Sequence, residues 1–291
     1  MKYYQHLSSL VFTILSICFV APWLAGQAAA AGLSSDWVKT PYTQSRLMVG
    51  GYDPATQKLH LGWHVLLAKG WKTYWRSPGE AGMPPRWNWH ETKNLRQISV
   101  KWPVPERLNF YGYDTFVYHD EVILPVEVDL KDPTAATQLS LALDYMVCKD
   151  ICVPLNGEYH LDLPPAADMS FSPYQRALLQ KYRARLPEQL PAGRVRVVDQ
   201  GNGRLHIRGN LAKLVSGPIR DLYVEAPEGY SFSRPERTDE AVLSGPDGSL
   251  DLRIGYEKQK HAPTLSGQDI ILTFVTETGH GHEIRATVSS P

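Results

Sequence analysis

Net charge, cysteine and long apolar runs are all scarce in this 291-residue sequence. Its 30 Lys and Arg residues balance 30 Asp and Glu residues. This balance argues against a nucleic-acid or membrane-surface partner, because such partners require a basic face. Beyond the N-terminus, no stretch is apolar enough to span a membrane. Only three cysteines are present, and a chain of this length can bury a core without disulfide staples. The cysteines therefore require an explanation other than stability.

The N-terminus has the pattern of a secretory signal peptide. A positively charged start precedes an apolar stretch over residues 7–24, and small residues follow over 26–31. We expect cleavage after Ala30 or Ala31, which also removes Cys18. The alternative, an uncleaved membrane anchor, is less favoured because the apolar stretch is short and a good cleavage site follows it. Export places the mature chain in the periplasm, where disulfides persist.

Two regions of the mature chain alternate polar and apolar residues, as half-buried β-strands do. In the first region, over about 50–163, clear examples are residues 58–67 and 158–163, and clusters of Pro and Gly separate the strands. The pattern resumes from Arg194, with Gly-containing turns between the strands. Many short strands with turn signals between them predict an antiparallel β-sandwich in each region.

One helix is expected between the two strand-rich regions. Ser172 matches an N-cap, Pro173 the first helical position and Gln175 a capping box. We expect Pro187 and Pro191 to end the helix. An apolar stripe repeats at every fourth residue, at Tyr174, Leu178, Tyr182 and Leu186. The expected segments are a signal peptide over 1–31, a first β-sandwich over 32–168, a linker helix over 169–191 and a second β-sandwich over 192–291.

The two cysteines of the mature chain, Cys148 and Cys152, lie at the ends of a three-residue turn between two expected strands. Cysteines that close such a turn can approach the Cα separation of ~4.4–6.8 Å that a disulfide needs. The loop-entropy model gives only about 2 kcal/mol for so small a ring, against about 4.7 kcal/mol for a hundred-residue loop. A redox pair instead needs two sulfurs close together, so that one can resolve a mixed disulfide on the other. Spacing alone leaves both a redox pair and a structural hairpin bridge open.

The charged residues next to Cys148 have opposite effects on its thiolate form, so no net shift is predicted from them. Lys149 adjoins Cys148 and favours its thiolate, whereas Asp150 opposes that effect. The C-x3-C spacing differs from the C-x2-C of a thioredoxin site, and no βαβ pattern surrounds it. A thioredoxin fold is therefore not expected.

Three stretches together resemble the N-terminal periplasmic domain of the disulfide reductases DsbD and ScsB. They are residues 70–85, which include Gly-Trp-Lys-Thr-Tyr-Trp, residues 108–118 followed by 122–125, and the loop over 148–154. The resemblance covers about 37–165 well and the later region more loosely. It implies immunoglobulin-like domains. The expected fold class is therefore all-β, with two immunoglobulin-like antiparallel β-sandwich domains joined by one short helix.

The same resemblance implies a function. It implies periplasmic thiol–disulfide exchange by a protein-disulfide reductase or interchange module that needs no cofactor. The implied partners are periplasmic thioredoxin-fold proteins. In that family a membrane-embedded domain supplies the electrons, and this sequence ends at Pro291 without such a domain. Either a separate membrane electron-transfer protein therefore supplies the electrons as a further partner, or the cysteine pair has another role.

The resemblance also implies roles for single residues. Cys148 matches the cysteine that engages the partner, and Cys152 matches its companion. Phe110 matches the tip of an aromatic cap loop that shields the cysteines, and Tyr111 and Tyr113 lie beside it. An aromatic ring over a sulfur is a favourable contact that also excludes other thiols. The alternative for Phe110 is an ordinary core or loop aromatic.

Two functions of other classes stay open. Met146 and the two cysteines offer soft sulfur ligands for Cu(I), although no metal site is predicted outright. Histidines could add imidazole ligands, but single histidines on a sheet are more often structural; the candidates are His60, His64, His280 and His282. Alternatively, the aromatic residues between Trp63 and Trp102 could form a sugar-stacking platform. The chain would then be a carbohydrate- or protein-binding module with a purely structural disulfide.

Overall fold

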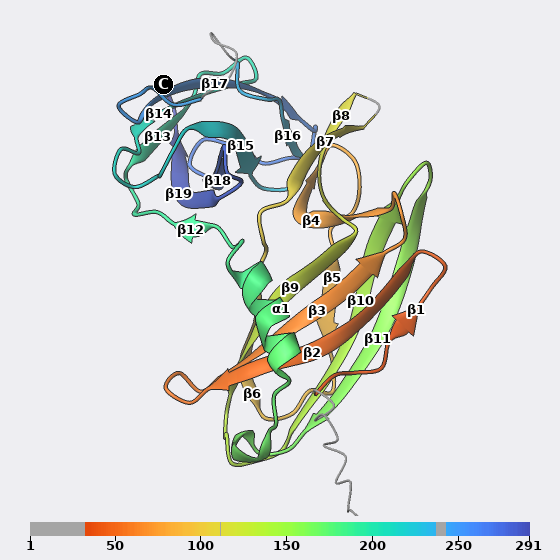
Figure 1. The fold of residues 1–291 in the computed structure, drawn as a ribbon. Helices are drawn as coiled ribbons and strands as arrows, with labels where there is room; N and C mark the ends of the chain where they lie inside the picture. The colour runs from red at the N-terminus through yellow and green to blue at the C-terminus, as the bar shows by residue number, and fades with distance from the viewer. Residues whose placement is uncertain (1–32, 111, 237–242) are drawn as a thin grey trace, which may run out of the picture. The chain divides into compact units, whose positions relative to one another are not determined.

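The structure is a computed structural model that describes residues 33–110, 112–236 and 243–291. Within these residues the protein consists of nineteen β-strands, one α-helix and one short 3₁₀-helix (Figure 1). The predicted all-β class with a single α-helix is therefore confirmed. The expected signal peptide and Tyr111 lie outside the described residues. No helix in the described ranges is long and apolar enough to cross a membrane.

The first β-region contains two antiparallel sheets (Figure 1). One sheet has the order β1 (Val38–Lys39), β2 (Thr43–Asp53), β3 (Lys58–Leu67), β9 (Glu121–Leu130) and β6 (Leu95–Val100). The other has the order β11 (Cys152–Leu163), β10 (Thr137–Cys148), β4 (Lys72–Gly79), β8 (Tyr113–His119) and β7 (Glu106–Phe110), with β5 (Arg86–Trp89) paired to β10. The second sheet therefore contains both predicted site segments, the cysteine hairpin and the cap loop.

Buried aromatic residues and hydroxyl groups connect the two sheets of this region. The Trp63 indole nitrogen donates to the Tyr159 hydroxyl over 3.0 Å, and the Ser45 hydroxyl lies 2.7 Å from the same oxygen. The Thr43 and Tyr145 hydroxyls pair over 2.9 Å. Burial raises the pKa of Tyr159 to about 12. These bonds satisfy the polar ends of side chains whose apolar parts fill the core.

The tryptophans between Trp63 and Trp102 belong to this core rather than to an exposed platform. Trp63 and Trp75 are fully buried, and the others are half-buried and pack against the same cluster. Among the described residues, the large exposed apolar side chains are Tyr113, Ile151 and Tyr174. No exposed row of rings, the feature that a sugar-stacking platform requires, is present in the described ranges.

The helix α1 (Pro173–Arg183) follows a short 3₁₀-helix (Ala166–Asp168) and begins as predicted. Ser172 is its N-cap and accepts a hydrogen bond from the backbone of Gln175. The predicted stripe is only partly correct, because Tyr174 is 68% exposed and Leu179, outside the stripe, is buried. The Gln175 side chain donates to Ser34 instead of completing a capping box. The helix also ends four residues before Pro187, where its last turn gives way to a turn conformation.

Helix α1 packs on the sheet that contains β2 and β9. The close approach depends on two glycines of that sheet. A Cβ atom at Gly50 would lie 2.5 Å from Leu179, and one at Gly62 would lie 3.1 Å from it. The expected linker helix is therefore a packed part of the first region.

The second β-region is one continuous sheet that carries its own apolar core. Its order is β15 (Ile219–Glu225), β18 (Asp269–Thr276), β19 (Gly281–Ser289), β13 (Val195–Asp199), β14 (Arg204–Asn210), β17 (Ser249–Lys258) and β16 (Tyr230–Phe232), with β12 (Glu188–Gln189) paired to β19. The pairings of β19 with β12 and β13 are parallel, and the others are antiparallel. An antiparallel pattern alone does not predict these two parallel contacts.

The two β-regions share contacts beyond the helix. Tyr223 and Val275 of the second region pack in the core cluster of the first. The Tyr223 hydroxyl donates to the Pro105 carbonyl over 3.2 Å. Because the described regions belong to one compact unit, the predicted domain boundaries stay a prediction.

Candidate functional site

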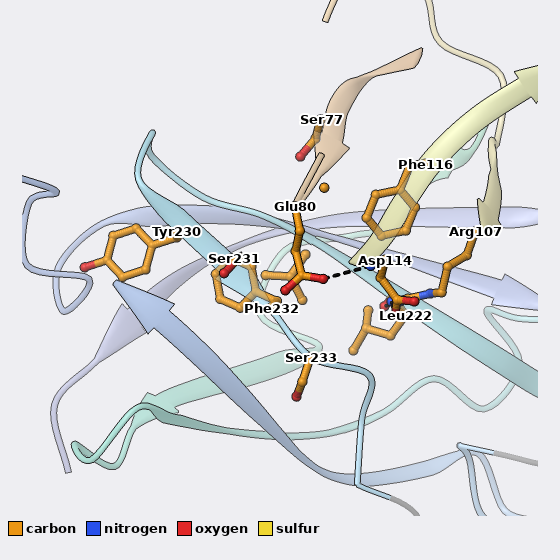
Figure 2. A pocket seen from close by; sticks show the side chains of 12 residues that line it. Ser77, Glu80, Arg107, Asp114, Phe116, Leu222, Tyr230, Ser231, Phe232 and Ser233 are labelled. Atoms are coloured by element: carbon orange, nitrogen blue, oxygen red, sulfur yellow. Dashed lines mark hydrogen bonds and ion pairs between the residues drawn. The ribbon is translucent and has the colours of Figure 1, made fainter. Parts of the chain in front are cut away.

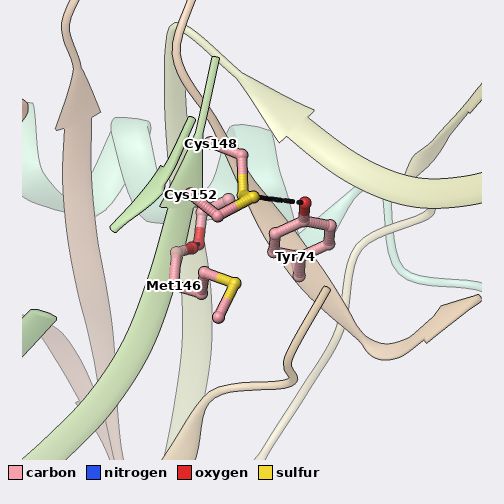
Figure 3. The surroundings of a disulfide bond; sticks show 5 residues. Tyr74, Met146, Cys148 and Cys152 are labelled. Carbon is pink, nitrogen blue, oxygen red and sulfur yellow. Dashed lines mark hydrogen bonds between the residues drawn. A yellow bond between two sulfur atoms is a disulfide. The ribbon is translucent and has the colours of Figure 1, made fainter. Parts of the chain in front are cut away.

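Cys148 and Cys152 form a disulfide at the end of the β10–β11 hairpin (Figure 3). They are the last directly opposed pair of the ladder, and their Cα atoms are 4.1 Å apart. In the intervening turn, the Lys149 backbone nitrogen donates to the Ile151 carbonyl over 3.0 Å. The hairpin predicted from the sequence thus brings the two sulfurs together by local geometry.

The two cysteines differ sharply in exposure. Cys148 is 0% exposed and belongs to a small apolar cluster with Tyr74 and Val117. Cys152 is exposed, and the neighbouring Ile151 is 63% exposed. A protein partner can therefore reach Cys152 more easily than Cys148 while the hairpin keeps this conformation.

Tyr74 on β4 contacts the disulfide directly. Its hydroxyl donates to the Cys148 sulfur over 3.0 Å and lies 4.0 Å from the Cys152 sulfur (Figure 3). Burial raises the pKa of Tyr74, so its hydroxyl keeps the proton that it donates. A donor at this position stabilises a thiolate on Cys148 when the disulfide opens.

Tyr74 was not among the predicted site residues, although it lies within the 70–85 stretch. A glycine in that stretch makes room for the Tyr74 ring, but its role is evident only from the fold. A Cβ atom at Gly82, where φ is +108°, would lie 2.2 Å from the Tyr74 ring. Gly82 therefore leaves the space in which the ring points toward the sulfurs.

Lys72 is a second residue that the sequence did not identify. It lies directly opposite Cys148 in the β4–β10 ladder, so both side chains are on the same face of the sheet. Lys72 is only 4% exposed, and burial lowers its pKa, whereas the charge of Asp150 acts in the opposite direction. Its ammonium nitrogen lies 4.0 Å from the centre of the Phe110 ring. A lysine thus lies on the same face of the sheet as the buried cysteine, with its ammonium over Phe110.

Two of the predicted cap residues lie on the strands β7 and β8, which together we call the cap hairpin (residues 106–110 and 113–119). Phe110 and Tyr113 are its last opposed pair, and Tyr111 lies outside the described residues. Phe110 is half-buried and contacts Lys72, whereas Tyr113 is 55% exposed. Leu108, on the same strand as Phe110, packs against the cluster that contains Cys148. The cap hairpin therefore contacts the immediate surroundings of the buried cysteine.

The candidate metal ligands are only partly brought together. Met146 packs against the cluster that contains Cys148. The predicted histidines have other partners: His64 contacts Glu121 over 2.9 Å, and His60 accepts from Arg183. His282 lies 3.6 Å from Glu188. Within the described part of the chain, no three His, Cys, Asp or Glu residues form a group that could hold a metal ion.

Comparisons with known proteins match part of the chain to a family model. Residues 47–164 match the N-terminal domain of the thiol:disulfide interchange protein DsbD. The structure also matches the crystal structure of the N-terminal periplasmic domain of ScsB from Proteus mirabilis, with a TM-score of 0.68. That match covers 89% of this chain and 99% of the other at 22% sequence identity, which establishes the fold alone.

A second solved structure, the GAE domain of yeast GGA1, matches with a TM-score of 0.26. It covers 44% of this chain and 96% of the other at 10% sequence identity. This likeness is too low to support an argument about fold or function. A search of curated protein sequences found no match.

Proposed function

We propose that this protein exchanges disulfides with other periplasmic proteins through Cys148 and Cys152; the match of residues 47–164 to the N-terminal domain of the thiol:disulfide interchange protein DsbD supports this function. One observation carries the proposal. The disulfide joins an exposed cysteine to a buried cysteine whose sulfur accepts a hydrogen bond from Tyr74. Such an asymmetric pair gives a partner one accessible sulfur and provides a stabilised leaving group on the other.

The proposed reaction starts at Cys152, in the reverse of the order implied by the resemblance. When the pair is reduced, the Cys152 thiolate attacks a partner disulfide, and one partner sulfur leaves as a thiolate. The Cys148 thiolate then attacks the Cys152 sulfur, which breaks the mixed disulfide, closes the Cys148–Cys152 bond and releases the second partner thiolate. Two electrons pass from the pair to the partner. The exposure of Cys152 and the burial of Cys148 support this order.

Tyr74 and Lys72 favour the thiolate form of Cys148 in this scheme. The Tyr74 hydroxyl is already at hydrogen-bond distance from the Cys148 sulfur. Lys72 supplies a positive charge on the same face of the sheet. A charge-assisted hydrogen bond and a nearby cation both lower the free energy of a thiolate. Cys148 is therefore a good leaving group when a partner thiolate opens the disulfide at Cys152.

The proposed role of the cap hairpin is to limit access to the pair. Phe110 covers the Lys72 ammonium, and Leu108 packs against the cluster that contains Tyr74, Val117 and Cys148. The partners proposed are periplasmic thioredoxin-fold proteins, together with a separate membrane electron-transfer protein. Ile151, which precedes Cys152 in the chain and is exposed, offers apolar contact area for such proteins, and Tyr113 on the cap hairpin is exposed as well.

A trapping experiment tests the proposal. Cys148→Ser removes the resolving thiol, so a disulfide-bonded partner should stay attached to Cys152. Cys152→Ser is the matched control, because it leaves only the buried thiol and should trap little. Adducts are separated by non-reducing electrophoresis of periplasmic extracts and identified by mass spectrometry. Adducts mainly in the Cys152→Ser variant would reverse the proposed order, and adducts in neither variant would remove the exchange function.

Copper binding is a second candidate, favoured by the packing of Met146 against the cluster that contains Cys148. In the reduced protein, one thioether and two thiolates form a ligand set suited to Cu(I). Titration of the reduced protein with Cu(I) should give a sulfur-to-copper charge-transfer band. Met146→Leu, which keeps the volume but removes the sulfur, should weaken that band. A silent titration would remove this candidate.

A further inference from the structure

Arginines gather on one face of the second β-region, over β13, β14 and β17. Along these strands, buried apolar residues alternate with mostly polar ones. The opposite face from the core carries Arg196, Arg208 and Arg253, all of them exposed. The balanced net charge of the whole chain therefore conceals a local concentration of positive charge. The residues that face the core are Val195, Val197, Leu205, Ile207, Leu250, Leu252 and Ile254.

Two of these arginines, Arg196 and Arg208, lie directly opposite each other in the β13–β14 ladder. Opposed side chains in a sheet have Cβ atoms about 4.5–5.5 Å apart, and like charges at such positions destabilise the pair. Within the described part of the chain, neither guanidinium forms an ion pair with a carboxylate. An anion bound between the two guanidiniums would offset their repulsion and stabilise the folded state.

A buried histidine fixes the position of one of the two guanidiniums. His206 is 4% exposed, and its Nε2 atom lies 2.6 Å from a carboxylate oxygen of Asp251. The Nε atom of Arg208 lies 3.0 Å from the same Nε2 atom, and its Nη2 atom lies 3.1 Å from Nδ1 of His206. The guanidinium therefore packs on the imidazole ring. Its Nη1 atom has no hydrogen-bond partner among the described residues and remains available to a ligand.

A cavity of about 430 Å³ opens beside this pair of arginines. This volume lies in the range of small-molecule sites, so a small anion and part of the molecule that carries it fit inside. Asp251 lies opposite Arg208 on β17, but it does not line the cavity, and His206 engages its carboxylate. The charged side chains that line the cavity are thus positive. The lining residues are Arg196, Val198, Gln200, His206, Arg208 and Pro291.

The smaller cavity in Figure 2, of about 40 Å³, differs because its charged groups neutralise one another. There the Arg107 guanidinium donates to both oxygens of Asp221 and to Asp114. Arg234 also donates to Asp114. The Glu80 carboxylate accepts from the Asp114 backbone nitrogen over 2.8 Å, as the dashed line in Figure 2 marks. Those charges are used within the protein, whereas the opposed arginines of β13 and β14 leave theirs for a ligand.

We propose that Arg196 and Arg208 bind the phosphate group of an anionic ligand in this cavity. A phosphate group has enough oxygens to accept from both planar guanidiniums, whereas the two oxygens of a carboxylate are satisfied by one. The phosphate group belongs to a free phosphate or to a phospholipid headgroup, and its chemistry at the two guanidiniums is the same. The inference does not depend on the proposed exchange function, because the site shares no residue with the cysteine pair.

The first test titrates the mature protein into inorganic phosphate at constant ionic strength and follows binding by phosphorus NMR. Arg196→Gln removes one of the two guanidiniums and should weaken binding about tenfold, which corresponds to ~1.4 kcal/mol. The double variant Arg196→Gln/Arg208→Gln should show no binding. Arg204→Gln is the matched control, because Arg204 is an exposed arginine on β14 that pairs with Glu236 over 3.6 Å and does not line the cavity. Its affinity should change by less than about twofold.

Several outcomes of this titration would overturn the proposal. If the double variant binds phosphate as tightly as the unmodified protein, or if Arg204→Gln weakens binding as much as Arg196→Gln, the site is wrong. If acetate binds as tightly as phosphate, the class of ligand is wrong. Should the double variant fail to fold, Arg196→Gln alone decides, because the Arg196 side chain is exposed and has no ion-pair partner among the described residues.

A second test distinguishes the two sources of the phosphate group. The mature protein is sedimented with vesicles of phosphatidylglycerol, and vesicles of phosphatidylcholine, which carry no net charge, serve as the control. Sedimentation that the double variant loses and that inorganic phosphate competes away identifies a lipid headgroup. Binding of inorganic phosphate without sedimentation identifies a free phosphate. Binding in neither test overturns the proposal, and neither test involves a thiol, so a failure here is separate from a failure of the trapping experiment.

Discussion

The two hairpins of the candidate site are held in place in different ways. In the β10–β11 hairpin, every residue from Thr137 to Cys148 faces a partner on β11, and a disulfide closes the end. The cap hairpin has only five opposed pairs, and its charged side chains reach Asp221 and Arg234 in the second region. One hairpin is thus defined by neighbours along the chain, and the other by residues far away in sequence. Local strand pairing thus positions the disulfide, whereas contacts with the second region help to position the cap hairpin.

Removing the Arg107 side chain should lower the free energy of unfolding more than any other change considered, because it breaks the long-range contacts of the cap hairpin. Arg107→Ala removes the arginine that pairs with Asp221 and one of the two arginines that bind Asp114, in a largely buried setting. Breaking a buried ion pair in this way costs about 3–5 kcal/mol of unfolding free energy. Urea denaturation measures the loss. Arg196→Ala, an exposed arginine on β13, is the control and should change stability by less than about 0.5 kcal/mol.

The charge of Asp114 should make the anchoring of the cap hairpin sensitive to acid. Its pKa is about 2 in the folded protein, and about 3.9 in an unfolded chain. The stabilisation is therefore fully present above about pH 4 and is lost as the pH falls through 2, with a total of about 2 kcal/mol. The difference in unfolding free energy between the unmodified protein and Asp114→Asn should shrink between pH 6 and pH 2. A constant difference over that range would contradict this account.

Opening the disulfide should have a smaller effect on stability than removing Arg107. The ring that it closes is so short that the entropic contribution is at most about 2 kcal/mol. Urea denaturation with and without dithiothreitol gives the value. The double variant Cys148→Ala/Cys152→Ala should show no dependence on the reductant. A loss above that of Arg107→Ala would mean that the β10–β11 ladder depends on the disulfide more than its pairing indicates.

Removing the Tyr74 hydroxyl should have the smallest effect of these changes. The effect should appear in the reduction potential of the cysteine pair. Tyr74→Phe removes the donor to the Cys148 sulfur and so destabilises the thiolate of the reduced form. The reduction potential should become more negative by roughly 10–30 mV, because 30 mV corresponds to about 1.4 kcal/mol. Tyr118→Phe on β8, whose hydroxyl donates to the Pro103 carbonyl, is the control and should leave the potential unchanged. A less negative potential in Tyr74→Phe would mean that the hydroxyl stabilises the disulfide instead.

The potential itself decides whether the pair carries electrons at all. Exchange proteins lie at about −120 to −270 mV, whereas bonds below about −300 mV resist reduction. We expect a value in the first range, measured by equilibration in graded glutathione or dithiothreitol buffers with alkylation of the free thiols. A value in the second range would make the disulfide a hairpin staple.

Several features could be predicted from the sequence because they depend on local chemistry. The alternation of polar and apolar residues predicted the strands, and Ser172 predicted the start of helix α1. The predicted end of that helix, at Pro187, was wrong, because the helix ends at Arg183. The exposed side of the helix was also misjudged at Tyr174, because packing of Leu179 against Gly50 and Gly62 decides which side faces the sheet. Such packing depends on both the helix and the sheet, so the sequence of the helix alone does not predict it.

The sequence by itself predicted that Cys148 and Cys152 lie together at a hairpin end, because a three-residue turn between two strands brings its ends close. Only the tertiary structure decided which of the two is exposed and which residues surround the buried one. Lys72 and Tyr74 reach Cys148 through a strand register that joins positions more than seventy residues apart. The anchoring of Arg107 by Asp221 spans more than one hundred positions. Spacing along a chain fixes contacts within a turn, whereas contacts across a sheet or between regions depend on how the whole core packs.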